Sequence, residues 1–356
     1  MLKKKLLCMT LITGMLLAGC GGASSEDSTV QSSQPAGAQS EESEGEESVS
    51  GETPASDAEG DKITLRVGTN LALGTATPYV SRELGYFDDS AISMELLEFS
   101  DGSALMEAFA ADEMDIAFVG VAPVATWYSK GVPLKIVAAA NGGGHVLMTR
   151  EDTGITSVAD LAGKTVAEPG IGTVTDALLR AKILPSAGLS ADDITAVPGM
   201  KPADMASVLE VTKEVDAIIT WEPYAAQAEA AYDDIRVLYD SPVEIREETG
   251  SDSFYPVNVV IATQSLIDEH PDELAEFLDI YKKTVDFVNT DDSANAVLAD
   301  ILSLDESTVE NARKRIDYNY TLDEQGIMDT LQWFYDLEYI EELPKAEELI
   351  DTSLLG

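Results

Sequence analysis

The sequence predicts an α/β protein of two lobes, each built on a doubly wound sheet. Short apolar segments rich in β-branched residues alternate with longer helical segments along most of the chain. Three consecutive glycines, Gly142 to Gly144, interrupt that alternation, which then restarts. The span after residue 61 holds roughly 295 residues, which is large for a single hydrophobic core and suits two.

The first group of elements alternates regularly between strand and helix. We expect strands at 63–68, 93–98, 115–119 and 134–140, and helices at 77–84, 103–111 and 121–129. The run at 134–140 is continuously apolar, which is typical of a strand buried on both faces. Strands joined by helices predict a parallel sheet, with the loops that follow the strands gathered at one edge, where ligands bind.

The glycine run predicts a turn or a hinge, because three glycines weaken any regular element. Beyond it we expect strands at 165–167, 194–197, 216–220 and 257–262, and helices at 173–182, 203–212 and 223–231. From residue 264 onward the chain reads as almost pure helix, including 272–289. One lobe is thus expected from 62–142 plus 256–356 and the other from 143–255, joined by hinge strands near Gly142 and Pro256.

The N-terminus predicts export and a lipid anchor. Three lysines precede a short apolar run, which is too short to span a bilayer and ends in Leu17-Ala18-Gly19-Cys20. This pattern resembles a bacterial lipobox, so we expect 1–19 to be a signal peptide and Cys20 to be acylated on the extracytoplasmic face of the cell membrane. The alternative is an ordinary secretory signal with a chance cysteine.

Residues 20–61 predict a disordered acidic tether. After Cys20 they are almost entirely Ser, Glu, Gly, Ala, Gln and Pro, and such a segment buries too little surface to offset chain entropy. A flexible coil of about 41 residues has an end-to-end distance of roughly 35 Å. A spacer is therefore a better interpretation of this segment than a binding site.

Composition argues against several classes of function. The formal net charge is −43, which makes nucleic acid and anionic lipid surfaces poor partners. Cys8 leaves with the signal peptide, so the mature chain has no disulfide and no thiol beyond its anchor. The sequence has only two histidines, His145 and His270, which are not at metal-ligand spacing, and no phosphate loop or nucleophile elbow occurs. We therefore expect no enzyme, no cofactor and no metal site.

Several segments, in one order from residue 63 to residue 337, resemble a known family. They are Gly68-Thr69-Asn70, Glu83-Leu84-Gly85-Tyr86-Phe87, Ala108-Phe109 with Met114-Asp115-Ile116-Ala117, Gly120-Val121-Ala122-Pro123, Gly131-Val132-Pro133-Leu134-Lys135-Ile136-Val137, Leu161-Ala162-Gly163-Lys164-Thr165-Val166-Ala167, and Asp216-Ala217 with Trp221-Glu222-Pro223-Tyr224. In order and spacing they resemble the solute-binding proteins of ABC importers. The most similar branch takes nitrate, taurine and aliphatic sulfonates (the SsuA, TauA and NMT1/THI5-like group), with relatives that bind pyrimidine precursors.

This resemblance implies a periplasmic-binding-protein fold of type II and a function in transport. The protein would bind a small organic solute or oxyanion between its lobes and deliver it, as a monomer, to an ABC permease with its cytoplasmic ATPase. Lobe closure about Gly142–Gly144 and the Pro256 strand would accompany binding. A sensory lipoprotein that presents its ligand to a receptor is the alternative.

The candidate ligand contacts lie in loops that follow strands and at the N-termini of helices. For the first lobe they are Thr69, Asn70, Gly102, Ser103, Val121, Ala122 and Asn141. For the second lobe they are Gly170, Gly172, Thr173, Thr175, Trp221 and Glu222. The segment 168–173 could instead be no more than a capped turn into a helix, and Trp221 could belong to the core.

Glu222 bears on the class of ligand. A carboxylate in the cleft would disfavour a sulfonate and favour a ligand with N–H donors or positive charge, but it could simply cap the helix that begins near Pro223. No arginine near these loops is an obvious clamp for an anion, although backbone donors at helix ends can bind one. His145 could reach the cleft, but a hinge-flanking or exposed position is the stronger expectation.

Overall fold

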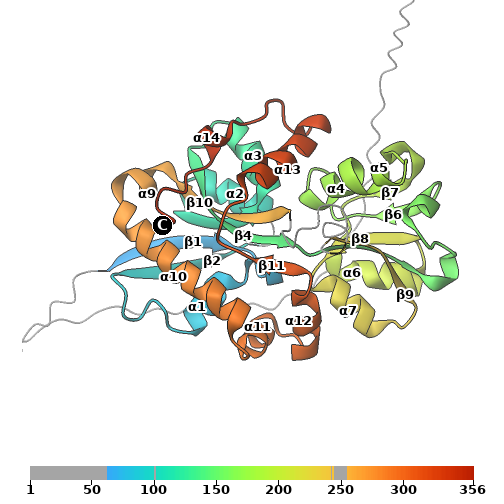
Figure 1. Cartoon of the computed structure of the whole chain (residues 1–356), viewed down its shortest axis with the longest axis horizontal. Coiled ribbons are helices and arrows are strands. Elements are labelled where there is room, and N and C mark those ends of the chain that lie inside the picture. Colours follow the sequence, from blue (N-terminus) through green and yellow to red (C-terminus); the bar gives the residue numbers. More distant parts are fainter. Residues whose placement is uncertain (1–61, 100–101, 242, 244–254) are drawn as a thin grey trace, which may run out of the picture. The chain divides into compact units, whose positions relative to one another are not determined.

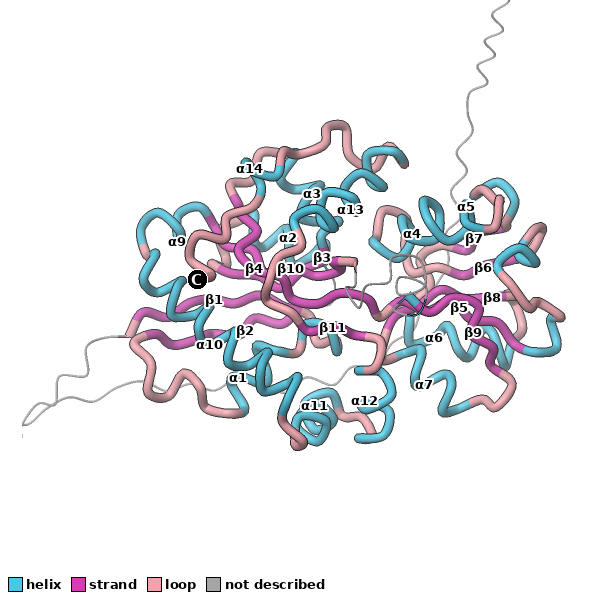
Figure 2. Tube along the Cα trace, in the orientation of Figure 1, coloured by secondary structure: helices cyan, strands magenta, loops and turns pink. Residues whose placement is uncertain are grey.

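Two β-sheets with helices packed on both faces organise the chain (Figures 1 and 2). The computed structural model describes residues 62–99, 102–241, 243 and 255–356. The expected signal peptide, Cys20 and the tether lie outside the described residues.

The first sheet has six strands in the order β11-β4-β10-β3-β1-β2. Its strands are β1 (Ile63–Thr69), β2 (Ile92–Glu98), β3 (Ile116–Gly120), β4 (Leu134–Gly143), β10 (Pro256–Thr263) and β11 (Ile316–Tyr318). β1, β2 and β3 are mutually parallel, whereas β10 pairs antiparallel with both β3 and β4. We call the part of the chain built on this sheet lobe 1.

The second sheet has five strands in the order β7-β6-β8-β5-β9. Its strands are β5 (His145–Arg150), β6 (Thr165–Ala167), β7 (Thr195–Val197), β8 (Ala217–Trp221) and β9 (Ile235–Asp240). β6, β7 and β8 are parallel, and β5 runs antiparallel to β8 and to β9. We call the part built on this sheet lobe 2.

Both sheets are mixed, so the expected parallel pairing holds for β1 to β3 and for β6 to β8 but not for every strand. The antiparallel strands are β5 and β10, which arrive from the other lobe, and β11, which pairs with β4 at the edge of the first sheet. β4 leaves lobe 1 at the carboxyl edge of its sheet, and β5 enters lobe 2 two residues later from the corresponding edge, so it must run against β8. β10 enters lobe 1 in the same way and runs against β3. The two-lobe α/β architecture itself is confirmed.

The helices agree closely with the sequence pattern. They are α1 (Thr77–Glu83), α2 (Gly102–Ala110), α3 (Val121–Ser129), α4 (Val174–Leu178), α5 (Leu184–Ser186), α6 (Pro202–Ser207), α7 (Tyr224–Ala231), α9 (Gln264–Glu269), α10 (Pro271–Thr290), α11 (Ala294–Leu302), α12 (Glu306–Arg313), α13 (Glu324–Asp336) and α14 (Ala346–Leu349). A π-helical segment, Leu179–Ile183, joins α4 to α5, and another, Val208–Thr212, extends α6.

The two faces of the first sheet face separate cores. Val259 and Ile261 point to the side covered by α2, α3 and α13, whereas Val260 and Ala262 point to the side covered by α1, α10 and α11. On the second side Phe118 meets Tyr281 of α10 edge-on, with ring centroids 5.3 Å apart. Helices cover both faces of this sheet, so successive residues of a central strand are all buried. This explains the continuously apolar segments in the sequence.

Three strands were not predicted from the sequence: β5, β9 and β11. β5 contains His145, Thr149 and Arg150, yet all six of its residues are buried. Arg150 is accommodated because its Nη1 donates to the carbonyls of Leu209 and Val215, at 2.9 and 2.7 Å. In the described part of the chain, no helix is both long and apolar enough to cross a membrane.

Candidate functional site

The carboxyl edges of the two sheets meet where the chain passes between the lobes. Asn258 of β10 lies in register with Gly120 at the end of β3 on one side and with Asn141 of β4 on the other. Four residues after Asn141, His145 is in register with Trp221, the last residue of β8. The loops that were predicted to bind ligand therefore follow strands that end at this junction.

Asn141 and Asn258 form the polar centre of the lobe 1 edge. The Asn258 Nδ2 donates to the Asn141 Oδ1 at 2.7 Å, and Asn141 is only 4% exposed. A Cβ at Gly74 would lie 2.6 Å from that same Oδ1, so the loop after β1 closes directly onto Asn141. Asn258 was missed in the sequence, although a lone amide inside the apolar strand 256–263 is the signal that marks it.

Thr69 and Asn70 serve the loop after β1. The Thr69 hydroxyl is buried and donates to the carbonyls of Asn70 and Thr75. The Thr75 hydroxyl donates to the Asn70 carbonyl at 2.8 Å and to its Oδ1 at 3.2 Å. These bonds hold the loop in the shape that brings Gly74 against Asn141, so both predicted residues shape the loop that lies on Asn141.

The starts of α2 and α3 differ in character. Gly102 is the first residue of α2 and Ser103 beside it is exposed. Val121 and Ala122 are the first residues of α3, and both are buried in the largest apolar cluster. Val121 thus contributes an apolar side chain. The sequence had suggested it for a different reason, the free backbone N–H groups at the N-terminus of a helix.

In lobe 2 the loop from β6 to α4 is built as a capped turn. The Thr173 hydroxyl accepts from the Asp176 N–H at 3.2 Å and donates to the Gly170 carbonyl at 2.8 Å. Gly172 has a φ of +80°, and its N–H donates to the Asp176 Oδ2 at 2.9 Å. Thr175 is the second residue of α4 and is buried. The capped-turn alternative therefore describes Thr173 and Gly172 correctly, and any role for them in binding a ligand stays a prediction.

Glu222 is fully engaged by protein groups. Its Oε1 accepts from the Arg315 Nη1 at 2.8 Å, its Oε2 accepts from the Ala226 N–H at 3.0 Å, and its side chain has no exposed surface. Burial raises the pKa of Glu222, and the bonds from Arg315 and Ala226 oppose that rise. The helix-capping interpretation of Glu222 is thus the one its contacts favour. Trp221, next to it, is half-buried and meets Tyr224 edge-on at 6.2 Å.

Arg315 belongs to lobe 1 and binds three carboxylates of lobe 2, a group we call the Arg315 cluster. Besides Glu222, its Nη1 lies 2.7 Å from the Glu229 Oε2 and its Nε 2.7 Å from the Asp240 Oδ2. Arg315 immediately precedes β11, which pairs with Gly143 at the crossover. The cluster therefore joins the lobes beside the hinge glycines.

A second buried group, the Asp176 cluster, contains Glu168, Asp176, Arg180 and Tyr339. Arg180 donates from Nη2 to the Glu168 Oε1 at 2.5 Å and from Nε to Asp176. The hydroxyl of Tyr339, which follows α13 of lobe 1, donates to the Asp176 Oδ2. Arg180 and Arg315, which were not expected near these loops, are both paired with carboxylates.

His145 lies beside the hinge, as one of the two expectations had it, and the expectation of exposure is wrong. It is 3% exposed, and its Nδ1 lies 2.7 Å from the Tyr255 hydroxyl. Burial lowers the pKa of His145 to about 4, so the ring is neutral at physiological pH. The glycines before it do not form a turn: β4 continues to Gly143, and only Gly144, with φ of +86°, separates it from β5.

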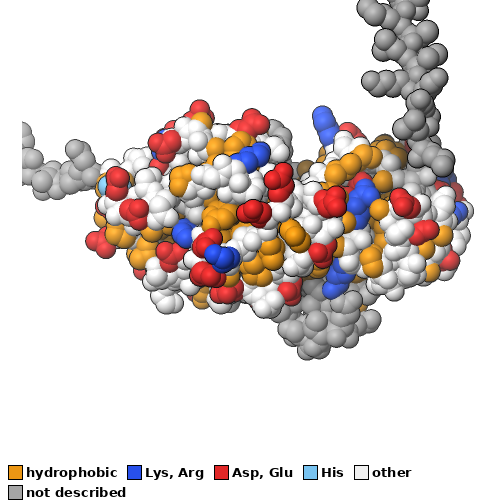
Figure 3. Space-filling model, turned by 90° about the horizontal axis from the view of Figure 1, so that it is seen from above, with side chains coloured by type: hydrophobic (Ala, Val, Ile, Leu, Met, Phe, Trp, Pro, Cys, Tyr) orange, Lys and Arg blue, Asp and Glu red, His pale blue; other side chains and the backbone are white. Residues whose placement is uncertain are grey.

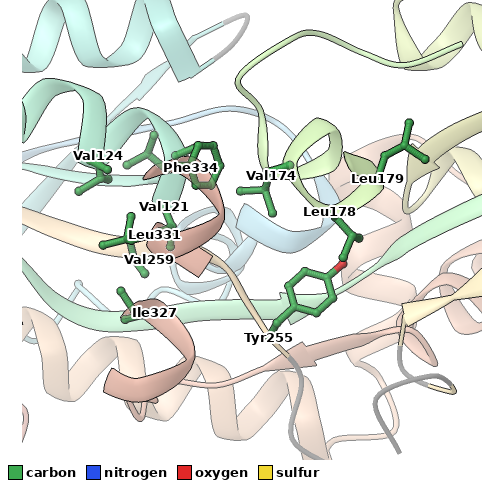
Figure 4. Close-up of a cluster of buried hydrophobic side chains, with 14 of the residues drawn as sticks. Val121, Val124, Val174, Leu178, Leu179, Tyr255, Val259, Ile327, Leu331 and Phe334 are labelled. Carbon is green, nitrogen blue, oxygen red and sulfur yellow. The ribbon is translucent and has the colours of Figure 1, made fainter. Parts of the chain in front are cut away.

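Apolar side chains from both lobes share one cluster at the junction (Figure 4). Val174 and Leu178 of α4 lie on the side of lobe 2, and Leu331 and Phe334 of α13 lie on the side of lobe 1, next to Val121 of α3. An apolar wall with a few polar groups at its edge is the usual make-up of a small-molecule site.

Similarity to known proteins identifies the family of this chain. A family model described as NMT1/THI5 like matches residues 74–293. The chain belongs to the NMT1/THI5-like family. The match begins in the loop that carries Gly74 and ends after α10, so it covers the candidate loops of both lobes except Thr69 and Asn70.

Relatives of this NMT1/THI5-like chain are named as binding proteins. A candidate aliphatic sulfonates-binding protein of Bacillus subtilis (strain 168) is 27% identical over 302 residues, which cover 82% of this chain and 86% of the relative. The taurine-binding periplasmic protein of Escherichia coli (strain K12) is 25% identical over 191 residues, 53% of this chain and 55% of the relative.

Solved structures share the fold of this NMT1/THI5-like chain. The periplasmic aliphatic sulphonate binding protein SsuA of Escherichia coli matches with a TM-score of 0.69 at 20% identity, covering 83% of this chain and 99% of that one. The periplasmic nitrate-binding protein NrtA of Synechocystis PCC 6803 matches with a TM-score of 0.67 at 13% identity, covering 83% and 87%. DszB in complex with biphenyl-2-sulfinic acid also matches, with a TM-score of 0.65.

Proposed function

We propose that this protein is the extracytoplasmic substrate-binding component of an ABC importer. The observation that supports it most is the junction of two α/β lobes at the carboxyl edges of their sheets, in a chain of the NMT1/THI5-like family. The ligand would lie against the apolar wall of Val121, Val174 and Phe334, with Asn141 and Asn258 as polar partners at its edge. Delivery to permease subunits follows from that role.

The proposed ligand is a small sulfonate or a related oxyanion. The named sulfonate-binding and taurine-binding relatives support this class. Glu222 does not oppose this class of ligand, because its side chain is buried and both of its oxygens already accept hydrogen bonds, from Arg315 and from the Ala226 N–H. Backbone N–H groups and the two amides are the donors that would hold the anion.

The experiment that tests this proposal is a ligand screen on the purified mature chain. We expect at least one of ethanesulfonate, taurine, nitrate or an aminopyrimidine to raise the melting temperature, because a ligand that binds only the folded state stabilises it. Titration calorimetry would then measure the affinity. Native mass spectrometry of protein from its own host would reveal a ligand outside the screen. Turnover of any bound compound would point to an enzyme instead.

The remaining features of the proposal concern the chain as a whole. A lipid anchor at Cys20, the tether at 20–61, a monomeric state and lobe boundaries at 142/143 and 255/256 all rest on the sequence pattern. Asp and Glu side chains are spread over the visible face among apolar ones (Figure 3). A surface of this charge disfavours adsorption to nucleic acid or anionic lipid, which suits a domain that must move between solution and a permease.

A further inference from the structure

The Asp176 cluster holds more negative than positive charge in a buried place. The side chains of Glu168 and Asp176 have no exposed surface, and Arg180 is the cation that both of them contact. Two ionised carboxylates around one guanidinium leave a formal charge of −1 out of contact with water. Such a charge is costly unless it is paired or neutralised by a proton.

One oxygen of this group lacks a partner. The Glu168 Oε2 is buried and receives no hydrogen bond, although Oε1 accepts from Arg180. Both oxygens of Asp176 are used: Oδ1 by Arg180, and Oδ2 by Gly172 and Tyr339. A proton on Glu168 would remove the excess charge and turn the unpartnered oxygen into a donor. Burial and the neighbouring Asp176 raise the pKa of Glu168 to about 7, which agrees with this arrangement.

The same cluster connects the lobes and the candidate ligand loop. Tyr339 reaches Asp176 from the segment after α13 and packs against Phe334, with ring centroids 6.0 Å apart. Gly172, in the loop from β6 to α4, donates to the same Asp176 oxygen. A change of charge at Glu168 therefore acts on Asp176, the residue that holds both the contact with lobe 1 and the loop.

We propose that Glu168 and Asp176 share one proton while the lobes are in contact, and that loss of this proton weakens the contact between Tyr339 and α4. The charged and titratable groups that face Glu168 are Asp176 and Arg180 on the helical segment, and Tyr339 from lobe 1. The backbone on the β7 side contributes the Val197 carbonyl and the Met200 N–H, which bond the Glu168 main chain. The protein would thus open more readily as pH rises.

The direction follows from proton linkage. At low pH, Glu168 is protonated whether the lobes are in contact or apart, so the proton favours neither arrangement. As pH rises from about 4.5 to about 7, a Glu168 released to water ionises while the buried one keeps its proton, so the closed population falls. The ratio of closed to open molecules falls by at most about tenfold per pH unit in this range. Above it the ratio is constant.

Distance measurements between the lobes test this without any ligand. In the full chain with Cys8→Ser and Cys20→Ser, spin labels at Glu107→Cys of α2 and Asp192→Cys of lobe 2 report the inter-lobe distance by double electron–electron resonance. We expect the closed fraction to fall between about pH 4.5 and about pH 7 and to stay constant above that range. Glu168→Gln should stay closed throughout, because its amide N–H replaces the shared proton as the donor to Asp176.

Three further variants sharpen the result. Tyr339→Phe should shift the population toward the open form at every pH, because it lacks the hydroxyl that bonds Asp176. Glu214 is an exposed carboxylate of lobe 2, so Glu214→Gln should show the same pH dependence of the closed fraction as the unmodified chain. Glu222→Gln measures the separate contribution of the Arg315 cluster. The proposal is overturned if the unmodified chain shows no pH dependence, or if Glu168→Gln keeps it. Neither outcome bears on which ligand the protein binds.

Discussion

Arg315 forms ion pairs with three carboxylates that all come from lobe 2. Glu222 is fully buried, Asp240 is partly buried, and Glu229 is more exposed. Removing the cation of a buried ionic group is much more harmful than removing a surface pair, because the remaining charges stay desolvated and repel one another. We therefore expect Arg315, although it lies in the short segment between α12 and β11, to contribute strongly to the stability of the fold.

Arg315→Gln should lower the free energy of unfolding by about 3 kcal/mol near pH 7. Without the guanidinium the three carboxylates take up protons more readily in the folded state, so the loss should shrink as pH falls toward 5. Urea unfolding at both pH values measures this. Arg236→Gln is the control, because the pair that Arg236 forms with Glu151, at 3.8 Å, is exposed. Equal losses for the two variants would contradict the role given to Arg315.

Trp221 is half-buried at the end of β8, with one edge against Tyr224. Trp221→Ala should weaken binding of the ligand found in the screen by about 1–3 kcal/mol and leave the urea midpoint nearly unchanged, as expected for an aromatic wall. Calorimetry and urea unfolding separate the two effects. Trp127→Ala on α3, next to Lys130, is the matched aromatic control. Unfolding of the Trp221 variant would place this side chain in the core instead.

At the scale of elements, the crossover between the lobes depends on the backbone of Gly144. Its φ is +86°, and a Cβ there would lie 3.3 Å from the Ile316 Cγ1 of β11. Gly131 has nearly the same φ, +85°, with no atom within 4 Å of the Cβ position. The two glycines therefore differ in the contact with β11 and share the conformational requirement.

Gly131→Ala should cost about 1–2 kcal/mol of folding free energy, the usual cost of a left-handed backbone for a residue with a Cβ. Gly144→Ala should cost about 1 kcal/mol more, because the added methyl group presses on Ile316. Equilibrium unfolding in urea measures both. If the two variants lose the same free energy of unfolding, Ile316 moves away from the added methyl group at no cost, and β11 does not constrain the backbone at Gly144.

The sequence predicted most elements because their patterns are locally complete. Helices such as α10 and buried strands such as β4 carry their own periodicity or apolar run. β5 and β11 were missed because what makes them strands is a partner far away in the chain. His145 is held by Tyr255, and the three residues of β11 pair with the end of β4. Long-range pairing of this kind leaves no local pattern.

The same limit explains the outcome for the candidate site. The strand-following loops were located correctly, because the carboxyl edge follows from topology. The side-chain partners were not, since Arg315 pairs with Glu222 across 93 positions of sequence and Tyr339 with Asp176 across 163. Asp176 and Arg180, four positions apart on one helical segment, are the pair that the sequence could have indicated.

At the scale of the whole molecule, the anchor and the folded part are expected to be independent. Cys20→Ser should move the protein from the membrane fraction to the soluble fraction, because acyl chains are the expected attachment. The melting temperature of this variant should match that of the unmodified protein. Membrane fractionation followed by a salt wash measures this, with Cys8→Ser as the control that leaves the lipobox cysteine in place. Retention of the Cys20 variant after the wash would contradict a lipid anchor.

The position of β10 has a consequence for the order in which the protein is made. β10 lies between β3 and β4, and it comes from residues 256–263, more than a hundred positions after either neighbour. The first sheet therefore stays incomplete until all strands of the second sheet have been synthesised. The strands of the second sheet all fall within 145–240, so that sheet can assemble from one continuous stretch. A chain of this topology must keep β1 to β4 from aggregating until their central partner, β10, has been made.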